Sequence, residues 1–309
     1  MKIIVTGGAG FIASHIADEY IKKGHKVVVI DNLWNGFRKN LNPKAKFYKA
    51  DIRDLAQMEK IFKKERPEVV NHHAAIAQVV LSVRDPIPTL TTNVLGTVNV
   101  LTAFGKYGKG PHRKFIYAST GGAMYGNPKK IPVNESAPQE PLSPYALSKQ
   151  MAEEAVLFYA KTYNFPYFIF RYANVFGPRQ NEKGEAGIVA IFMGLLKHNK
   201  QPTIFGDGSK TRDYVYVGDV AHANVLALAK GKNVRVNIGT GIEMSDREIF
   251  EAIARAAHYA GAPRYAPFRP GEIMHISIDA GRARRLLGWR PTVTLARGIQ
   301  NVADSMRRS

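Results

Sequence analysis

Short runs of apolar, often β-branched residues alternate with longer segments of helical periodicity over residues 1–171. The runs are almost continuously apolar, which is typical of parallel strands covered on both faces. Between them, apolar residues recur three and four positions apart, as on one face of a helix. This alternation predicts right-handed crossovers and an α/β fold with a doubly wound parallel sheet. The predicted strands are Lys2–Thr6, Lys26–Ile30, Lys46–Lys49, Glu68–His72, Lys114–Ala118 and Tyr167–Arg171, and the predicted helices include Phe11–Lys23, Asn93–Phe104 and Ser143–Tyr163.

The rhythm changes after Arg171, where glycine, proline and polar residues become frequent. Helical periodicity returns at Gly187–His198, strand patterns return at Asp213–Val217 and Val234–Ile238, and two or three helical patterns follow Thr240. The interruption predicts two interleaved domains. They are a larger domain, residues 1–171 plus 213–239, and a smaller α/β domain, residues 172–212 plus 240–309.

Composition removes several classes of function. The 309 residues include no cysteine, which excludes a disulfide framework, a thiolate zinc site, an iron–sulfur cluster and a cysteine nucleophile. No apolar run approaches the roughly 20 residues of a membrane-spanning helix, and glycines interrupt the first strand pattern before a signal-peptide core could form. These features predict a soluble, cytoplasmic protein without a membrane partner.

The chain carries a formal net charge of +19, from 44 basic and 25 acidic residues. Such an excess indicates either a polyanionic partner, such as nucleic acid, or an enzyme whose ligands are anions. The basic residues are scattered, and the densest run, Arg282–Arg285, is too short for a basic tail. Because no nucleic-acid-reading module accompanies the charge, we predict anionic small ligands and no nucleic-acid partner.

A glycine-rich turn follows the first predicted strand directly. Gly7, Gly8 and Gly10 precede the first predicted helix, where glycine lets backbone N–H groups approach a pyrophosphate. Asp31 ends the second strand, 21 residues after Gly10, at the spacing expected for a carboxylate that binds the ribose hydroxyls of adenosine. A negative charge there disfavours a 2′-phosphate. The pattern therefore predicts a Rossmann-type site for NAD.

A tyrosine and a lysine stand one helical turn apart at Tyr145 and Lys149, after Ser143 and Pro144, which suit a helix start. A lysine ammonium group near a phenol favours the phenolate and lowers the phenol pKa from about 10. Such a tyrosine can take a proton from a hydroxyl group while hydride leaves the same carbon atom. The pair therefore predicts a site of hydride transfer.

Together these motifs resemble the extended short-chain dehydrogenase/reductase superfamily. Segments in the second half are similar to those of the UDP-glucose (UDP-galactose) 4-epimerases: Arg171–Pro178, Gly206–Tyr214, Asn237–Gly239 and Arg269–Glu272. The resemblance implies that NAD contacts Gly7, Gly10, Phe11, Ile12, Asp31, Asn32, Asp51, Ile52, Ala74, Ala75, Asn93, Tyr145 and Lys149. It implies that a UDP-sugar contacts Thr120, Asn174, Arg212, Arg269 and Ile276.

The segment Ser119–Gly126 separates reactions within this superfamily. Relatives place a hydroxyl group here that bonds O4 of the sugar, but Gly121 occupies the usual serine position. The chain therefore resembles a Thr-Gly-Gly variant of the epimerases, in which Thr120 or Ser119 orients the substrate. Related 4,6-dehydratases carry Asp-Glu where this chain has Gly121-Gly122, and an elimination needs such an acid and base. The predicted catalytic residues are Tyr145, Lys149 and Thr120.

The resemblance implies a UDP-hexose 4-epimerase that interconverts UDP-galactose and UDP-glucose through a 4-keto sugar and enzyme-bound NADH. A UDP-glucuronate epimerase or decarboxylase, another NAD-dependent nucleotide-sugar oxidoreductase, and a catalytically inactive nucleotide- or nucleic-acid-binding protein are the alternatives. Ile276 aligns with the gate position beside the sugar, which implies that N-acetylated sugars are also accepted.

Two further expectations concern assembly and metals. Asn93–Phe104 and Ser143–Tyr163 resemble the helix pair that forms a four-helix dimer interface in relatives, so a homodimer is expected. His72 and His73 are adjacent on a predicted strand, where neighbouring side chains point to opposite faces. With no third ligand evident, no metal site is predicted.

Overall fold

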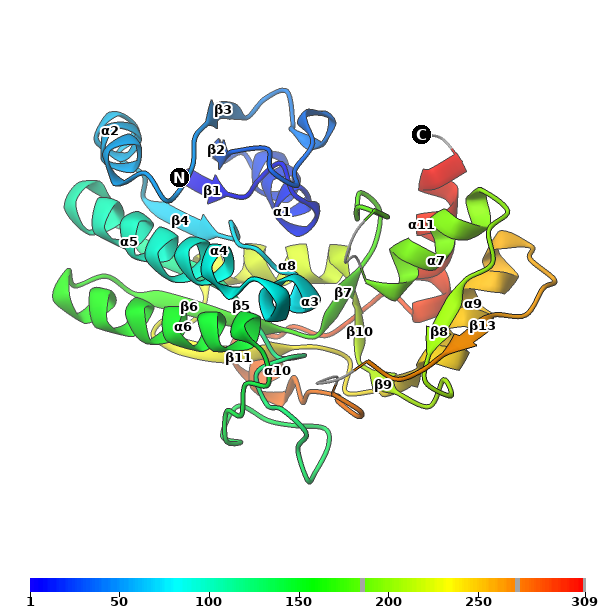
Figure 1. The fold of residues 1–309 in the computed structure, drawn as a ribbon. Helices are drawn as coiled ribbons and strands as arrows, with labels where there is room; N and C mark the ends of the chain where they lie inside the picture. Colours follow the sequence, from blue (N-terminus) through cyan, green and yellow to red (C-terminus); the bar gives the residue numbers. More distant parts are fainter. Residues whose placement is uncertain (184–186, 270–272, 308–309) are drawn as a thin grey trace.

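The computed structural model describes residues 1–183, 187–269 and 273–307. The larger part of the molecule is built on a seven-stranded sheet (Figure 1). The strand order is β11-β6-β5-β4-β1-β2-β3, and every pair of neighbouring strands is parallel. Its strands are β1 (Lys2–Thr6), β2 (Lys26–Asp31), β3 (Lys46–Lys49), β4 (Val69–His72), β5 (Lys114–Thr120), β6 (Tyr167–Tyr172) and β11 (Val234–Ile238). This order is that of a doubly wound dinucleotide-binding sheet and confirms the predicted fold class.

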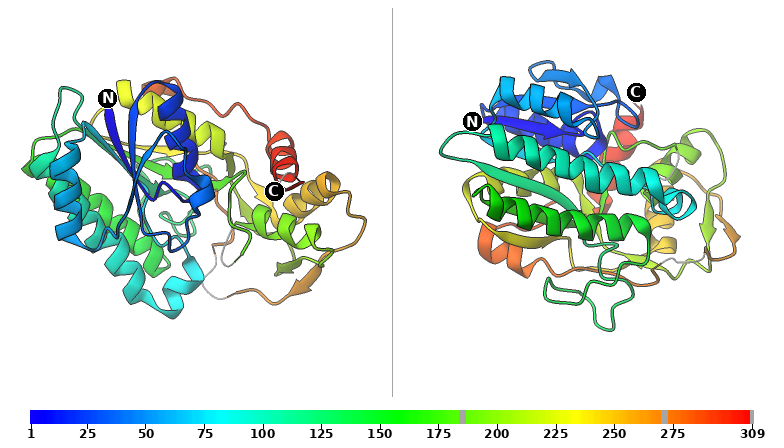
Figure 2. Two further views of the ribbon diagram at one scale, coloured as in Figure 1. Left: turned by 90° about the horizontal axis from the view of Figure 1, so that it is seen from above. Right: turned by 60° about the vertical axis from the view of Figure 1, so that its left-hand side comes forward.

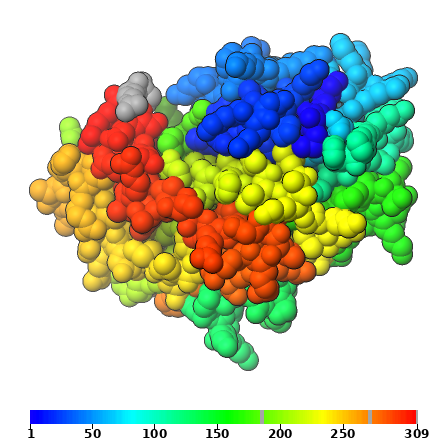
Figure 3. Space-filling view, turned by 180° about the vertical axis from the view of Figure 1, so that it is seen from behind, coloured from blue at the N-terminus to red at the C-terminus, as the bar shows by residue number. Residues whose placement is uncertain are grey.

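Helices cover both faces of this sheet. One face carries α2 (Leu55–Glu65), α5 (Gly96–Tyr107) and α6 (Pro144–Thr162), and the other carries α1 (Phe11–Lys22), α8 (Val217–Ala229) and α10 (Gly281–Leu287). Figure 3 shows the second face, with α1, α8 and α10 stacked from top to bottom. Apart from the edge strand β3, the strands are largely buried because each face packs against its own helical layer, which explains their apolar runs.

The smaller part packs three helices beside short strand pairs, on the right in Figure 1. Viewed from above, its helices stand apart from the main sheet (Figure 2, left). Its elements are β7 (Asn174–Phe176), α7 (Ile188–Lys197), β8 (Thr203–Phe205), β9 (Thr211–Arg212), β10 (Tyr214–Tyr216), β12 (Met244–Ser245), α9 (Asp246–Ala257), β13 (Arg264–Ala266) and α11 (Leu295–Arg307). The strand pairs are β7–β10, β8–β13 and β9–β12, and the core includes Phe192, Ile253 and Val302.

Several elements differ from the sequence-based prediction. The helix predicted at Asn93–Phe104 begins earlier, with a π-helical turn at Thr91–Leu95 that leads into α5. The short helices η1 (Arg38–Asn40), α3 (Val79–Arg84) and α4 (Pro86–Leu90) are further additions. Of the two returning strands, β11 joins the main sheet, whereas β10 pairs with β7 outside it. In the described residues, no helix has the length and apolar character needed to cross a membrane.

Candidate active site

The glycine turn after β1 lies against the chain that follows β4. Gly7 has φ +71°, and a Cβ atom there would lie 2.8 Å from the backbone nitrogen of Ala74. The N–H of Gly10 donates to the carbonyl of Gly7 at 2.9 Å, and Gly10 is the N-cap of α1. Phe11 and Ile12 open this helix and are half-buried. A bare backbone at a helix N-terminus fits a pyrophosphate, as the sequence predicts.

Asp31 lies at the end of β2, beside this turn. Its carboxylate accepts the N–H of Ala9 at 3.0 Å and the N–H of Leu33 at 2.7 Å. Burial raises the pKa of this carboxyl, and the two backbone hydrogen bonds oppose that shift. The residue is therefore anchored where a ribose next to the pyrophosphate would need an acceptor.

Two of the residues predicted to contact NAD, Asn32 and Asp51, form a small polar group with Arg53 after the ends of β2 and β3. The amide nitrogen of Asn32 donates to Asp51 at 2.9 Å. Arg53 hydrogen-bonds the Asp51 carboxyl and lowers its pKa to about 2. Ile52 is buried and occupies the space in which a side chain at Gly96 would lie. Asp51 is therefore ionised and held in place before any ligand binds.

Asn93 lies behind the predicted cofactor groove. Its amide accepts the N–H of Ile76 at 2.8 Å and donates to the Ile76 carbonyl at 2.9 Å and to Ser148 Oγ at 2.9 Å. Ala74 and Ala75 directly precede Ile76 and are half-buried. The side chain of Asn93 thus ties the segment after β4 to helix α6.

The three predicted catalytic residues meet at the carboxyl end of β5. Helix α6 begins at Pro144, and Ser143 caps it by accepting the N–H of Ala146 at 3.2 Å. Thr120, the last residue of β5, lies close enough to Tyr145 for its hydroxyl group to lower the pKa of the phenol. Lys149 donates to the carbonyl of Ala118 at 2.8 Å. The helix start and the strand end therefore bring the phenol, the hydroxyl and the ammonium group together.

Ser119, the alternative hydroxyl, is directed elsewhere. Its Oγ donates to the Glu153 carboxylate at 2.5 Å. Thr120, the next residue, is the one whose hydroxyl group acts on the pKa of Tyr145. Of the two hydroxyl groups that the sequence left open, Thr120 is the one that reaches the phenol.

The electrostatics correct one expectation. Burial raises the pKa of Tyr145 to about 12, and the hydrogen bond with Thr120 offsets only part of the rise. Burial also lowers the pKa of Lys149 to about 7, which Glu153 opposes. The prediction that Lys149 makes this phenol more acidic than usual was wrong for the protein's own groups. Removal from water disfavours the phenolate more strongly than Thr120 favours it.

The pKa of Lys149 predicts a pH-dependent stability. Between pH 7 and the ordinary lysine value of 10.5, the folded protein has lost this proton and the unfolded chain keeps it. Raising the pH in this window therefore favours the folded state. Relative to Lys149→Met, the free energy of unfolding of the parent should rise by up to about 1.4 kcal/mol per pH unit.

Urea unfolding of nucleotide-free protein at pH 6, 8 and 10 measures this difference. Lys161→Met, at an exposed position of α6, controls for the loss of a cationic side chain. A parent–Lys149→Met difference that stays constant from pH 6 to 10 would contradict the assignment.

The Gly121-Gly122 pair has a packing role. A Cβ atom at Gly121 would lie 2.6 Å from Cδ1 of Ile278, and one at Gly122 would lie 2.9 Å from Oδ1 of Asn174. Side chains at these positions would displace a core isoleucine and the amide of β7 that the sequence predicts to contact substrate. The glycines thus allow Asn174 to approach the end of β5.

The remaining predicted substrate residues have different surroundings. Arg212, on β9, is half-buried and donates to the carbonyl of Thr211 at 2.7 Å. Arg269 is exposed, with its guanidinium 3.6 Å from the centre of the Phe205 ring. Ile276 is buried in the hydrophobic core. The predicted motif after Arg269, residues 270–272, lies outside the described residues.

The structure adds a strap that sequence reasoning missed, made of Gly177–Asn181. The carbonyl of Pro178 accepts a hydrogen bond from His15 Nε2 at 2.9 Å, and Arg179 pairs with Asp18 at 2.8 Å. Asn181 donates to Asn35 at 2.9 Å. The Gly177–Asn181 strap is thereby fastened to α1 and to the loop after β2. These partners are far apart in sequence, so no local pattern indicates the contacts.

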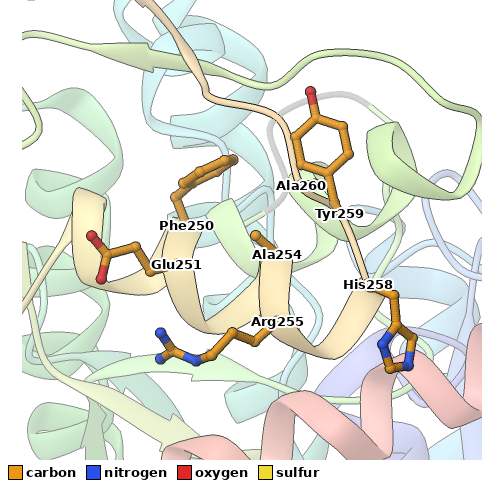
Figure 4. A pocket seen from close by; sticks show the side chains of 7 residues that line it. All are labelled: Phe250, Glu251, Ala254, Arg255, His258, Tyr259 and Ala260. Carbon is orange, nitrogen blue, oxygen red and sulfur yellow. The ribbon is translucent and has the colours of Figure 1, made fainter.

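Other features lie away from these residues. His72 bonds Thr6 and Thr97, and His73 bonds Tyr172, so both histidines have structural partners. A surface hollow of about 350 Å³ lies against α9 and the coil that follows it (Figure 4). Its lining residues, which include Phe250 and Tyr259, do not belong to the predicted site.

A parallel sheet of this order, a glycine turn beside an anchored aspartate, and a Thr–Tyr–Lys cluster define a dinucleotide-dependent enzyme of the short-chain type. The chain belongs to the NAD dependent epimerase/dehydratase family, whose model matches residues 3–239. A UDP-glucose 4-epimerase of Mycolicibacterium smegmatis is 42% identical, with 99% of both chains covered.

Two solved structures are also similar. The UDP-glucose 4-epimerase of Thermotoga maritima, determined with UDP-glucose, is 44% identical with a TM-score of 0.97, covering 100% of this chain and 99% of that one. The UDP-glucose 4-epimerase of Thermus thermophilus, in complex with NAD, is 41% identical with a TM-score of 0.93 and 99% coverage of both.

Proposed function

We propose that this protein is a UDP-glucose 4-epimerase, which interconverts UDP-galactose and UDP-glucose with NAD as its cofactor. The observation that carries the proposal is the placement of Tyr145 at the start of α6 beside Thr120 at the end of β5, with Lys149 one turn further along α6. The glycines that follow Thr120 offer no acid or base for an elimination, which argues against a dehydratase. The relatives described above support the same assignment.

The residues present fit NAD. The turn at Gly7 and Gly10 accepts the pyrophosphate at the start of α1, and the Asp31 carboxylate accepts the ribose hydroxyls. Bound there, NAD would supply the hydride acceptor for C4 of the sugar, and the positive charge of its nicotinamide ring would lower the pKa of Tyr145.

The protein's own groups move the proton. Tyr145 takes the proton of the sugar's 4-hydroxyl group through Thr120. It returns the proton to the same oxygen after the 4-keto sugar has rotated to present its other face. Arg212 and Arg269 hold the diphosphate, because arginine guanidinium groups pair with phosphate oxygens in a fork, and Asn174 contacts the nucleotide-sugar. Firm binding of the diphosphate, with few fixed contacts to the sugar, allows that rotation.

The deciding experiment incubates the purified protein with UDP-galactose and measures UDP-glucose by chromatography. Interconversion without net growth of NADH absorbance is the expected result. Growth of that absorbance would favour an oxidising nucleotide-sugar enzyme, and turnover of UDP-glucuronate alone would favour the alternative epimerase or decarboxylase. No turnover of any UDP-hexose would refute the proposal. UDP-N-acetylglucosamine, assayed in parallel, tests the relaxed specificity expected from Ile276.

We also propose a homodimer formed through the helices that cover one face of the sheet, where α5 and α6 lie side by side (Figure 2, right). Large apolar side chains are exposed there, with Ile87 at 66% and Phe158 at 65%. Apolar groups gathered on one face of a protein mark an interaction surface. The exposed group comprises Val83, Ile87, Leu95, Leu147, Met151 and Phe158.

Charges placed on this face should separate the protomers. The parent should elute as a dimer in light-scattering chromatography, and Leu147→Glu/Phe158→Glu should elute as a monomer. Leu286→Glu, on α10 at the opposite face, is the matched control and should remain dimeric. A monomeric parent would contradict the proposal.

The two-domain division and the cytoplasmic location remain predictions. The division we propose assigns NAD to residues 1–171 plus 213–239 and the UDP-sugar to residues 172–212 plus 240–309. The division is supported by strand β11. The chain first enters the smaller part after β6, and with β11 it joins the main sheet again.

A further inference from the structure

One buried carboxylate beside the catalytic cluster has no part in the chemistry described above. Glu153 lies on α6 one turn after Lys149 and two turns after Tyr145, and is fully buried. Residues four apart on a helix are neighbours, so Tyr145, Lys149 and Glu153 form one stripe directed at the sheet. The stripe places a negative charge next to the lysine on the side away from the phenol.

Four donor atoms from three residues surround this carboxylate. Arg171 binds both of its oxygens, through Nε at 2.9 Å and Nη2 at 2.7 Å. Arg235 approaches it at 3.1 Å, and Ser119 donates at 2.5 Å. Arg171 is fully buried as well. A buried ion pair of this kind is commonly no more stabilising than apolar residues of the same size, so stability alone is a weak reason for it.

The contacts reach the reacting groups by two routes. The hydrogen bond from Ser119 to Glu153 holds the end of β5 in place. Thr120 is the next residue of this strand and lies beside Tyr145. The Glu153 charge also acts on Lys149, because it raises the pKa that burial lowers. Loss of the carboxylate would therefore loosen the strand end and favour a neutral lysine.

Other titratable or charged groups face Lys149 from several elements. Tyr117 of β5 has its ring centre 5.0 Å from Nζ of Lys149, and the lysine charge lowers the pKa of both His72 of β4 and His73, which follows it. Arg171 of β6 and Arg235 of β11 lie behind Glu153. The phenol of Tyr145 and these neighbours are neutral or cationic. Among the described residues around Lys149, Glu153 is therefore the group whose negative charge offsets that of the lysine.

We propose that Glu153 is a positioning residue for the reaction, whose carboxylate holds Ser119, and with it the strand end that carries Thr120, and places a negative charge next to Lys149. The effect on turnover rests on the proposed epimerase function, whereas the effect on Lys149 does not.

The test removes the charge without leaving Arg171 unpaired. Glu153→Gln alone would bury an uncompensated guanidinium and could unfold the protein, so the informative variant is Glu153→Gln/Arg171→Met. Glu154→Gln is the matched control, because Glu154 is the exposed neighbour that also pairs with Arg235, at 2.7 Å. Thermal unfolding and NAD content establish that each variant is folded and loaded.

Two readouts follow. In protein labelled with carbon-13 lysine, the NMR titration of Lys149, assigned through Lys149→Met, should move down by about one pH unit in the double variant. Its kcat for UDP-galactose should fall by about tenfold or more, while KM stays within about threefold. Glu154→Gln should match the parent in both readouts.

An unchanged Lys149 titration in the double variant would refute the effect of Glu153 on the charge of Lys149. A parental kcat in the folded double variant would refute the proposal as a whole. If the double variant does not fold, Ser119→Ala keeps the ion pair intact. Its kcat should fall by about fivefold or more, and a parental value would refute the positioning of Thr120. A parent without epimerase activity would refute the proposed function instead, and would leave the titration result standing.

Discussion

Tyr145→Phe should lower kcat for the interconversion by about 10³-fold, because phenylalanine cannot take or return the proton of the sugar's 4-hydroxyl. The ring itself remains, so the packing at the start of α6 is preserved. The glycine turn and Asp31 are untouched, and the variant should retain NAD.

Single-turnover assays and NAD extraction from the same preparation measure both properties. Tyr159→Phe, at a half-buried position on the same helix, controls for the loss of a phenol from α6 and should keep parental turnover. Near-normal turnover by Tyr145→Phe would remove this residue from the proposed role. Loss of NAD from that variant would show that the phenol acts in binding rather than in proton transfer.

Gly7→Ala should abolish stable NAD binding, raising its Kd by about a hundredfold or more, which corresponds to about 3 kcal/mol. The added Cβ atom would lie 2.8 Å from the backbone nitrogen of Ala74, so the turn must move away from the end of β4. The positive φ of +71° adds strain of about 1–2 kcal/mol for any L-residue.

Gly24→Ala separates these two effects. Gly24 has φ +81°, and a Cβ atom there would have nothing within 4 Å. It should lose a similar amount of stability and keep NAD affinity. Isothermal titration with NAD and urea unfolding test both variants. Equal NAD affinity in the two proteins would show that the close approach to Ala74 is not needed for binding.

The fold was predictable because its signals are local. The strands of the main sheet other than the edge strand β3 are largely buried, so their residues form apolar runs that can be recognised without knowing which strands pair. The sequence pattern does not predict helix α8, because most residues of Val217–Ala229 are small or apolar. A helix that is buried on most sides has no polar face and therefore shows little periodicity. The β10 strand was recognised as a strand, but its pairing with β7 depends on the path of the intervening chain.

The site divides in the same way. Gly7, Asp31, Tyr145 and Lys149 stand at short, fixed spacings from their own strands and helices, so the local pattern is enough to predict them as site residues. Glu153 acts through residues on three different strands, so no spacing indicates it. The direction of the Tyr145 pKa shift was also out of reach, because it is set by burial.

The Gly177–Asn181 strap bears on how the enzyme is supplied with its dinucleotide. A catalyst that returns its nucleotide to the starting oxidation state in every cycle has no need to exchange it with the cell. The strap crosses near Phe11, at the same helix end that the glycine turn offers to phosphate, and is fastened by two hydrogen bonds and one half-exposed ion pair. Salt weakens such an ion pair. Replacement of a resident nucleotide should accordingly be slow in dilute buffer and faster in concentrated salt, so preparations of this protein are expected to carry the nucleotide acquired during synthesis.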